Sequence, residues 1–341
     1  MKRIIWMVQA AGFYCLTLGA TLIPAALLDR LAAGIGFLLS CILFNRRKIL
    51  LDNINRALPF MEHHPLWTAS PACSGRLARE NFQNMGRSLI EVCWLYHDRG
   101  EEVVTNIDLR GREHFEAAQS KGKGMICVSG HCGNWELMAL AIGRLLGEGA
   151  VIANRQKNPY FDRMVERMRM RYNSRVIYKK GAFRSILTAL KRGQLVGILA
   201  DQAALPADGV LIEVMGRKAW ASKAPVQLAR KSGAPLVPVF IHREGERHVI
   251  TFHPEHLLGE DLSEEGMRQE TQALSRYVEE FVVAHPTQWY WVHRRWKRAG
   301  EAAEATRKNP VGGNAVAPSD TPPGPAPVIG PVRPSTGGFS G

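Results

Sequence analysis

The sequence predicts an α/β protein with a mixed, largely parallel sheet flanked by helices and preceded by an N-terminal hydrophobic membrane anchor. Short apolar runs such as Met125–Val128 alternate with longer amphipathic segments such as Trp135–Leu146, an order typical of βαβ units. Polar residues follow the ends of these runs, where open α/β sheets usually place their chemistry. A long uncharged apolar run, Ile4–Leu28, opens the chain and indicates the anchor.

The anchor is predicted over residues 1–48. The first run, Ile4–Leu28, is long enough to cross a bilayer, and the two basic residues before it would place the N-terminus on the cytoplasmic side. The second run, Leu31–Phe44, is too short to span unaided and ends in basic residues. The pair either spans or lies as a shallow or re-entrant anchor, and a cleaved signal peptide is the competing interpretation.

The charge balance indicates an anionic partner. Formal net charge is +13, and hydrophobic residues make up 46% of the 341 residues, which is ample for a packed core. Basic residues concentrate over 160–192, where only Asp162 and Glu166 oppose them. We interpret this segment as a surface for an acidic carrier protein or for lipid phosphates, because no nucleic-acid motif accompanies it. A solvated helix face is the alternative.

The six cysteines lack the paired spacing of a zinc site or a disulfide framework. We therefore expect no metal site, and reduced thiols in a protein that faces the cytoplasm. Cys132, next to His131, has the chemistry of a nucleophile, but a small residue filling a turn is the better interpretation.

The most informative stretch is the turn Ser129–Asn134, between the strand Met125–Val128 and the helix Trp135–Leu146. His131 lies just past the strand end, and Glu136 lies in the first helical turn. We expect the Glu136 carboxylate to fold back onto one imidazole nitrogen, which leaves the other nitrogen free as a general base. The helix N-terminus would help to keep His131 neutral. A surface histidine beside a helix-stabilising glutamate is the simpler alternative.

The other elements are predicted from the same patterns. Before the turn, residues 54–96 are expected to be helical with a break at 63–74, and a short strand begins at Ile107. Later strands are expected at Val151–Ala153, Leu195–Gln202, Val210–Gly216, Leu236–His242 and Val249–Phe252. Later helices are expected at Lys223–Lys231 and Ser263–Ala284. The segment Gln288–Lys297 is dense in aromatics and cations, which suits a membrane–water interface, phosphate contact or a terminal helix packed on the sheet.

The segment His131-Cys-Gly-Asn-Trp-Glu136-Leu resembles the His-x4-Asp/Glu block of the lysophospholipid-acyltransferase-like superfamily, and more closely that of the lipid A biosynthesis lauroyl/myristoyl acyltransferases. Further matching blocks follow in order: Asn154–Pro159, Ala200–Gln202, Lys231–Val239 and Trp289–Lys297. The resemblance runs from about Met1 to Ala299. It departs around Glu213–Ser222, where Trp220 and Ser222 replace the family's aromatic and threonine residues. We therefore divide the chain into a membrane anchor (1–48), given by the apolar runs, an acyltransferase domain (49–299), given by the resemblance, and a tail (300–341). The tail is rich in Pro and Gly and has too few large apolar residues to order itself, so it is expected to be disordered.

The resemblance implies a membrane-bound enzyme of lipopolysaccharide biosynthesis, with its catalytic domain on the cytoplasmic side of the inner membrane. It would transfer a fatty acyl group from acyl carrier protein to a hydroxyl of a lipid A precursor, an anionic phosphorylated glycolipid. His131 would be the general base and Glu136 its orienting residue. Arg155 and Asn158 would bind substrate or the oxyanion. Asp201 would be a supporting residue of the site, paired with a neighbouring arginine or supporting the histidine, with a turn or cap residue as the alternative. Because the donor thioester is already activated, no metal or other cofactor is expected.

Two other functions remain open from the sequence. An enzyme of the same fold could acylate another glycolipid, a phospholipid or an aminolipid. A non-enzymatic basic protein could bind anionic membrane or nucleic acid, although the apolar start of the chain counts against a nucleic-acid role.

Overall fold

The computed structural model describes residues 2–23, 27–68, 73–97, 99–179, 181–297 and 299. This part of the chain belongs to one compact unit that ends at Ala299. The predicted tail, 300–341, lies outside the described residues.

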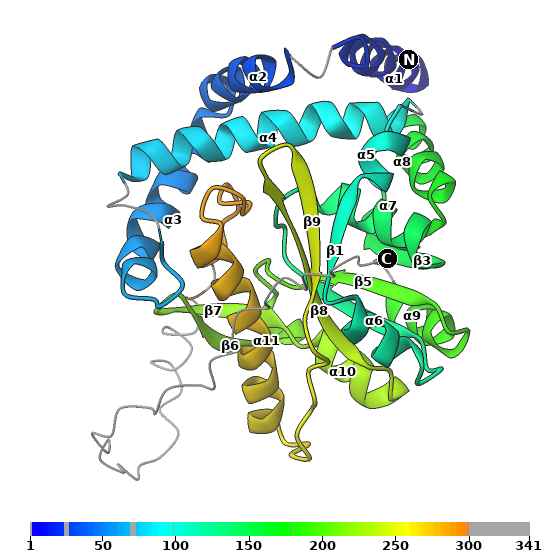
Figure 1. Cartoon of the computed structure of the whole chain (residues 1–341), viewed down its shortest axis with the longest axis vertical. Coiled ribbons are helices and arrows are strands. Elements are labelled where there is room, and N and C mark those ends of the chain that lie inside the picture. The colour runs from blue at the N-terminus through cyan, green and yellow to red at the C-terminus, as the bar shows by residue number, and fades with distance from the viewer. Residues whose placement is uncertain are drawn as a thin grey trace, which may run out of the picture. The chain divides into compact units, whose positions relative to one another are not determined.

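A seven-stranded sheet with the order β1-β9-β8-β2-β5-β3-β4 forms the centre of this unit (Figure 1). Its strands are β1 (Ile107–Arg110), β2 (Met125–Ser129), β3 (Gly149–Ala153), β4 (Ser174–Tyr178), β5 (Leu195–Leu199), β8 (Leu236–Glu244) and β9 (Arg247–Phe252). Every pair of neighbours is parallel except β8 and β9. A separate antiparallel hairpin pairs β6 (Gly209–Val214) with β7 (Arg217–Ser222). The predicted mixed, largely parallel sheet is confirmed.

Helices cover both faces of this sheet. They are α5 (Glu101–Thr105), α6 (Arg112–Gln119), α7 (Trp135–Leu145), α8 (Pro159–Arg171), α9 (Ala182–Lys191), α10 (Ala224–Ser232) and α11 (Glu264–Ala284). The central strand β2 shows why a continuous apolar run was needed. Its residues Met125 and Cys127 pack in the cluster that contains α7, whereas Ile126 and Val128 pack in the cluster that contains α9 and α10. Alternate side chains therefore fill opposite layers, as in other parallel sheets buried on both faces.

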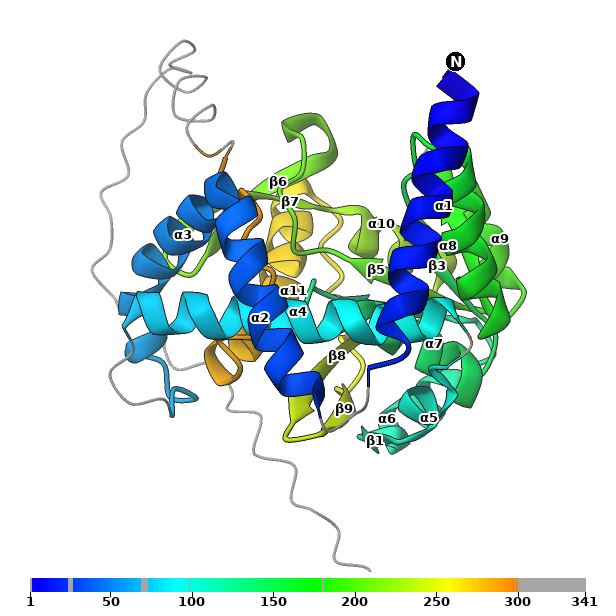
Figure 2. The ribbon, with the colours of Figure 1, turned by 90° about the horizontal axis from the view of Figure 1, so that it is seen from above.

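Four N-terminal helices form an additional layer: α1 (Lys2–Ala20), α2 (Leu28–Ile42), α3 (Phe44–Glu62) and α4 (Ser74–Tyr96). Helices α1 and α2 both pass over the long helix α4 (Figure 2). At the α2–α4 crossing, a Cβ on Gly36 or Gly86 would lie 2.5 Å from a backbone oxygen of the other helix. The two backbones can approach this closely because both positions are glycine.

The predicted anchor is divided between elements. The apolar run Ile4–Leu28 is not one helix, because α1 ends at Ala20 and α2 begins at Leu28. Among the described residues, α1 is the one helix that is long and apolar enough to cross a membrane, and α2 and α3 form a pair bent by 99°. The proposed boundary at residue 48 falls inside α3. Large apolar side chains are exposed on α1 and α2, among them Ile4, Val8, Leu16, Phe37, Leu38 and Ile42.

The aromatic segment near the end of the domain lies in the core and is irregular. Trp289, Trp291 and Trp296 are buried in one cluster with residues of α3, α4 and α11. Two buried asparagines bind its backbone: Asn53 of α3 donates to the carbonyls of residues 291 and 293, and Asn81 of α4 donates to those of residues 287 and 289. These tryptophans are therefore core residues and do not form a surface belt.

Candidate active site

His131 and Asp201 meet at the carboxyl edge of the sheet. Strands β2 and β5 pair in parallel with Ser129 opposite Leu199, so the residues two positions beyond each strand end are neighbours. The His131 Nδ1 lies 2.7 Å from Asp201 Oδ1, and the His131 backbone N–H donates to Asp201 Oδ2 at 2.8 Å. The sequence placed His131 just past a strand end and Asp201 among the polar residues that close a later strand. The strand β5 ends earlier than expected, at Leu199, and the strand order brings the two residues together.

The hydrogen bonds define the protonation of this pair. A carboxylate can only accept hydrogen bonds. Nδ1 of His131 therefore carries the hydrogen and donates a hydrogen bond to Asp201, and Nε2 keeps its lone pair. Burial lowers the pKa of His131, but the charge and hydrogen bond of Asp201 outweigh burial and bring that pKa above its ordinary value of 6.5. Burial raises the pKa of Asp201, but contact with His131 lowers it to about 2. The pair is therefore a base with a charged partner. The helix N-terminus was expected to keep His131 neutral by lowering its pKa, but the Asp201 carboxylate raises that pKa instead.

Two residues without a predicted role complete this arrangement. The indole Nε1 of Trp289 donates at 2.8 Å to Asp201 Oδ2, the oxygen that also accepts from the His131 backbone. The side-chain Nε2 of Gln202 lies 3.1 Å from Nε2 of His131, so this amide donates to the lone pair of the base. Gln202 directly follows Asp201, just beyond the end of β5. This position next to a candidate site residue is the sequence feature from which a role for Gln202 could have been predicted. Nothing local in the sequence connected Trp289 to Asp201, because the two residues lie 88 positions apart.

Glu136 has a different partner from the one expected. Its carboxylate accepts from Nε of Arg169 at 3.1 Å and from Nη2 of the same residue at 2.5 Å. The structure thus places Asp201, and not Glu136, at the orienting nitrogen of His131. Glu136 still acts on the base through space, because its negative charge contributes to the raised pKa of His131. Arg169 extends from α8, so the ion pair joins α7 to α8 beside the site.

Arg155 lies just past the carboxyl end of β3, as expected, but its side chain contacts Asp162 and Tyr178 and not the catalytic pair. Its Nη1 donates to Asp162 at 3.3 Å, and its guanidinium lies 3.8 Å from the centre of the Tyr178 ring. The side chain is 70% exposed. Among the described residues, no contact joins Arg155 to His131 or Asp201, so a role in the site would require the arginine to leave Asp162.

Asn158 is used to connect helices. Its side-chain oxygen accepts from the backbone of Tyr160 at 3.0 Å and caps α8, and its side-chain nitrogen donates to the carbonyl of Trp6 in α1 at 3.0 Å. The residue is buried. Both ends of the amide are therefore occupied by structural contacts between α8 and α1.

A buried network of charged residues connects the His131 turn to α4. Asn134 caps α7 by accepting from the backbone of Leu137, and its side-chain nitrogen donates to Glu91 at 2.9 Å. Glu91 also accepts from Arg243 at 2.8 Å and lies 3.2 Å from Nε2 of His248. Burial raises the pKa of Glu91, but His248 and Arg243 lower it to about 2. The turn is thereby fastened to α4 through a paired, fully charged carboxylate.

Cys132 is excluded as a nucleophile by its surroundings. The residue is fully buried, and burial together with the nearby Asp201 charge raises the pKa of its thiol well above the ordinary value. The protonated thiol is unreactive at neutral pH. Within the described residues, no group of three or more His, Cys, Asp or Glu side chains is placed to bind a metal ion.

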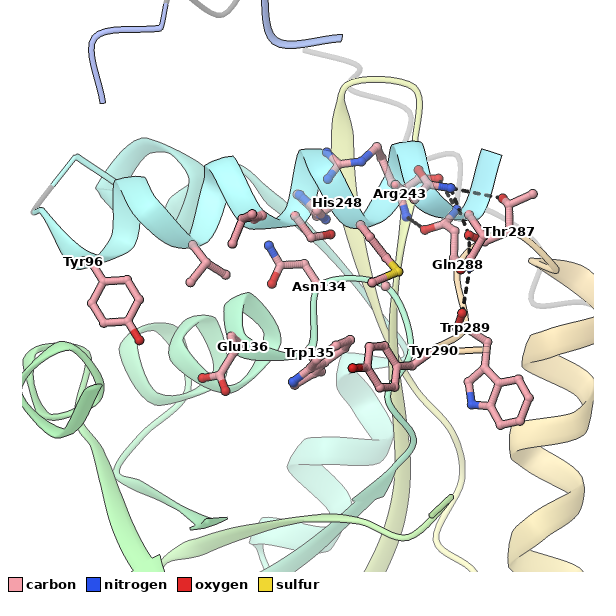
Figure 3. Close-up of a pocket in the computed structure, with 17 residues that line it drawn as sticks. Tyr96, Asn134, Trp135, Glu136, Arg243, His248, Thr287, Gln288, Trp289 and Tyr290 are labelled. Carbon is pink, nitrogen blue, oxygen red and sulfur yellow. Dashed lines mark hydrogen bonds between the residues drawn. The ribbon is translucent and has the colours of Figure 1, made fainter. Parts of the chain in front are cut away.

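An apolar cavity of about 310 Å³ borders the site, between α4 and the His131 turn (Figure 3). Its apolar walls come from α4 and from two aromatic residues, Trp135 and Tyr290. Both rings also contact the imidazole of His131, with ring centres 5.1 Å and 5.9 Å away. The cavity and the base therefore share one aromatic wall, as expected for a site that holds an apolar chain beside a reacting polar group.

Fold and site together define an α/β protein that presents a histidine–aspartate base at the carboxyl edge of a parallel sheet. The chain belongs to the bacterial lipid A biosynthesis acyltransferase family, whose model matches residues 2–298. The resemblance seen in the sequence is thus confirmed, and the protein is an acyltransferase.

Individual relatives agree with this family. The lipid A biosynthesis lauroyltransferase of Escherichia coli (strain K12) is 26% identical and covers 82% of this chain and 88% of its own length. The lipid A biosynthesis palmitoleoyltransferase of the same organism is 27% identical, with 81% and 86% covered. The phosphatidylinositol mannoside acyltransferase of Mycobacterium tuberculosis (strain CDC 1551 / Oshkosh) is 24% identical, with 72% and 76% covered.

Proposed function

We propose that this protein transfers a fatty acyl group from acyl carrier protein to a hydroxyl group of a lipid A precursor. The main support is the His131–Asp201 pair, which holds a basic nitrogen at the edge of an apolar cavity. The printed names of two relatives, a lauroyltransferase and a palmitoleoyltransferase of lipid A biosynthesis, support the acceptor.

The proposed reaction begins at Nε2 of His131. This nitrogen takes the proton of the acceptor hydroxyl while the oxygen attacks the thioester carbonyl. The tetrahedral intermediate collapses, the carbon–sulfur bond breaks, and the departing thiolate receives the proton from the imidazolium. Asp201 stabilises that imidazolium and fixes the ring in the productive tautomer. No protein nucleophile is needed, because the acceptor supplies the attacking oxygen.

Gln202 is proposed as the residue that exchanges its contact when substrate binds. Its side-chain nitrogen occupies the lone pair of His131 at 3.1 Å, which is the position the acceptor hydroxyl must take. Once displaced, the same amide would donate to the oxyanion, a task that preorganised amide donors perform in acyl transfer. Arg155 is a further candidate for this task by family resemblance, after release from Asp162.

The acyl chain is proposed to lie in the 310 Å³ cavity against α4, because its apolar walls reach Trp135 and Tyr290 beside the base. The acidic carrier would approach the basic segment 160–192. Part of that segment is internally paired, since Arg169 binds Glu136 and Arg175 binds Glu148. Arg163 of α8 has no carboxylate within ion-pair distance among the described residues, so we propose it as a contact for the carrier.

We also propose that the protein acts at the inner membrane from its cytoplasmic side. Support comes from α1, which has the length and composition of a spanning helix, and from the apolar side chains that α1 and α2 expose. Basic residues at both ends of this pair are consistent with a cytoplasmic, anionic surface.

The test is mass spectrometry of lipid A from the source bacterium without the gene, complemented by wild-type or His131→Ala protein. We expect loss of one secondary acyl chain in the deletion strain, restored by the wild type and not by His131→Ala. The matched control is His114→Ala on α6, which should restore the chain fully.

Each outcome separates the alternatives. Full restoration by His131→Ala, at equal abundance in the membrane fraction, would contradict the mechanism. Unchanged lipid A in every strain would point to another glycolipid acceptor, to be sought in the total lipid extract.

A further inference from the structure

A second cavity, of about 500 Å³, is bordered by Ala203, two residues after Asp201, and is lined by positive charge. Three cations border it, Arg46 from the start of α3 and Arg294 and Lys297 from the aromatic segment. Asn45, Ala203 and His293 complete the polar part of its wall. None of the described residues that line this cavity is acidic.

These cations lack the partners that other basic residues of the chain have. Within the described residues, no carboxylate lies within ion-pair distance of Arg46, Arg294 or Lys297, whereas Arg155, Arg169 and Arg175 are each paired. The first turn of α3 also contains no acidic residue. The amino end of α3 adds positive potential, which destabilises the basic residues nearby. A bound anion would offset this repulsion.

The cavity is connected to the base through three consecutive residues. The backbone N–H of Ala203 donates to Nε2 of His293 at 3.2 Å. Its chain neighbours are Gln202, which contacts Nε2 of His131, and Asp201, which binds Nδ1. An anion bound among these cations would therefore lie against the residue that directly follows the two contacts of the imidazole.

The frame that carries the cations is well fixed. Asn53, buried on α3, donates at 2.8 Å to the carbonyls of both Trp291 and His293. Arg46 donates from Nη1 to the carbonyl of Val292 at 3.3 Å. Arg294 and Lys297 thus extend from a backbone that is tied to α3, so the positions of their main chains are set before any ligand binds.

An exposed apolar surface leads to this cavity. Helix α2 exposes Phe37, Leu38 and Ile42, and Phe44 follows directly before Asn45 at the cavity wall. Such a combination of apolar surface and unpaired cations matches a lipid with an anionic headgroup. A lipid whose acyl chains lie along α2 would bring its phosphate to Arg46.

We propose that this cavity binds a phosphate ester of the acceptor lipid and thereby holds the acceptor hydroxyl at Nε2 of His131. The proposal rests on the proposed function. The donor offers the same chemistry, because acyl carrier protein presents its thioester on a phosphopantetheine arm. The apolar surface of α2 favours the acceptor as the source of the phosphate.

The test compares a pocket variant, Arg294→Gln with Lys297→Gln, against a control variant with the same loss of charge. The control is Lys123→Gln with Lys231→Gln, two cations that line a cavity near the amino ends of β2 and β8. Initial rates are measured with a phosphorylated acceptor and with its phosphatase-treated form. We expect the pocket variant to raise KM for the phosphorylated acceptor at least about tenfold, with kcat changed by less than about twofold. The control should match the wild type.

The outcomes are separable. Equal KM values for the phosphatase-treated acceptor in all three proteins would support the assignment. A raised KM for the acyl donor instead would keep the phosphate site and assign the phosphate to the phosphopantetheine arm. Wild-type KM values for both substrates in the pocket variant would overturn the proposal.

An equilibrium binding measurement distinguishes failure of the phosphate-site proposal from failure of the proposed function. If the wild type transfers no acyl group to either acceptor, the function is wrong, and the cavity is then judged by equilibrium binding to nanodiscs that contain the phosphorylated glycolipid. Weaker binding of the pocket variant than of the control would support the phosphate site. Equal binding would overturn it.

Discussion

Asp201 and Glu136 are two carboxylates that act on one histidine, and they differ in burial and in binding partner. Asp201 is buried, 4% exposed at its side chain, and binds His131 through both oxygens. Glu136 is 26% exposed at its side chain and is bound to Arg169. The residue nearer in sequence thus acts on the base only through space, whereas the distant one touches it.

This difference shows what a short sequence motif does and does not specify. The spacing between His131 and Glu136 puts both groups at the same strand–helix junction. It leaves open which way each side chain turns, because Arg169 on α8 offers Glu136 two hydrogen bonds. A guanidinium binds a carboxylate in a bidentate manner, which an imidazole cannot match.

The largest expected effect comes from Asp201→Asn. The amide of an asparagine can donate a hydrogen bond to Nδ1, which favours the tautomer that carries its hydrogen on Nε2. The neutral amide also cannot stabilise the imidazolium. We expect kcat to fall about 10²–10⁴-fold while the fold is retained. Initial rates and circular dichroism of the purified variant would measure both.

Glu136→Gln is the matched control for this change, and we expect its kcat to stay within about tenfold of the wild type. The comparison would be reversed if Glu136→Gln lost as much activity as His131→Ala and Asp201→Asn stayed active. Glu136 would then be the orienting residue during turnover.

The pH profile gives a finer measure of the same comparison. Only neutral His131 can act as a base, so log kcat/KM should fall by about one unit per pH unit below its pKa. Asp201 keeps that pKa above 6.5, so the midpoint of the acidic limb should lie above pH 6.5. Removing the Asp201 charge leaves burial dominant, and the midpoint should move to lower pH. Glu136→Gln should move it in the same direction by less, and a larger shift from Glu136→Gln would contradict the geometry.

The smallest effect concerns stability. The Glu136–Arg169 pair is partly exposed, so its loss should lower the free energy of unfolding by on the order of 1 kcal/mol. A double-mutant cycle with Glu136→Gln and Arg169→Gln, followed by urea denaturation, would measure the coupling between the two residues. A coupling energy near zero would mean that the ion pair contributes nothing and that Glu136 is free to turn toward His131.

Much of the fold was accessible from local patterns. The apolar runs predicted the central strands β2, β3, β5, β8 and β9, and the helices α7, α10 and α11 begin and end close to the expected residues. These predictions succeed because the side-chain period of a strand or helix is a property of consecutive residues. The aromatic segment around Trp291 was harder, because tryptophan suits a membrane interface and a core equally well, and its burial depends on Asn53 and Asn81 from other helices.

By itself, the sequence determined the fold class, the family, the placement of His131 just past a strand end, and the placement of Asp201 near the end of another strand. The tertiary structure decided that β2 and β5 are neighbours in a register that pairs Ser129 with Leu199, and so which carboxylate meets the histidine. It also decided that Arg46 and Arg294 border one cavity although they lie far apart in the chain. Periodicity is local, whereas these contacts depend on strand order and helix packing, which are set by the burial of the whole chain.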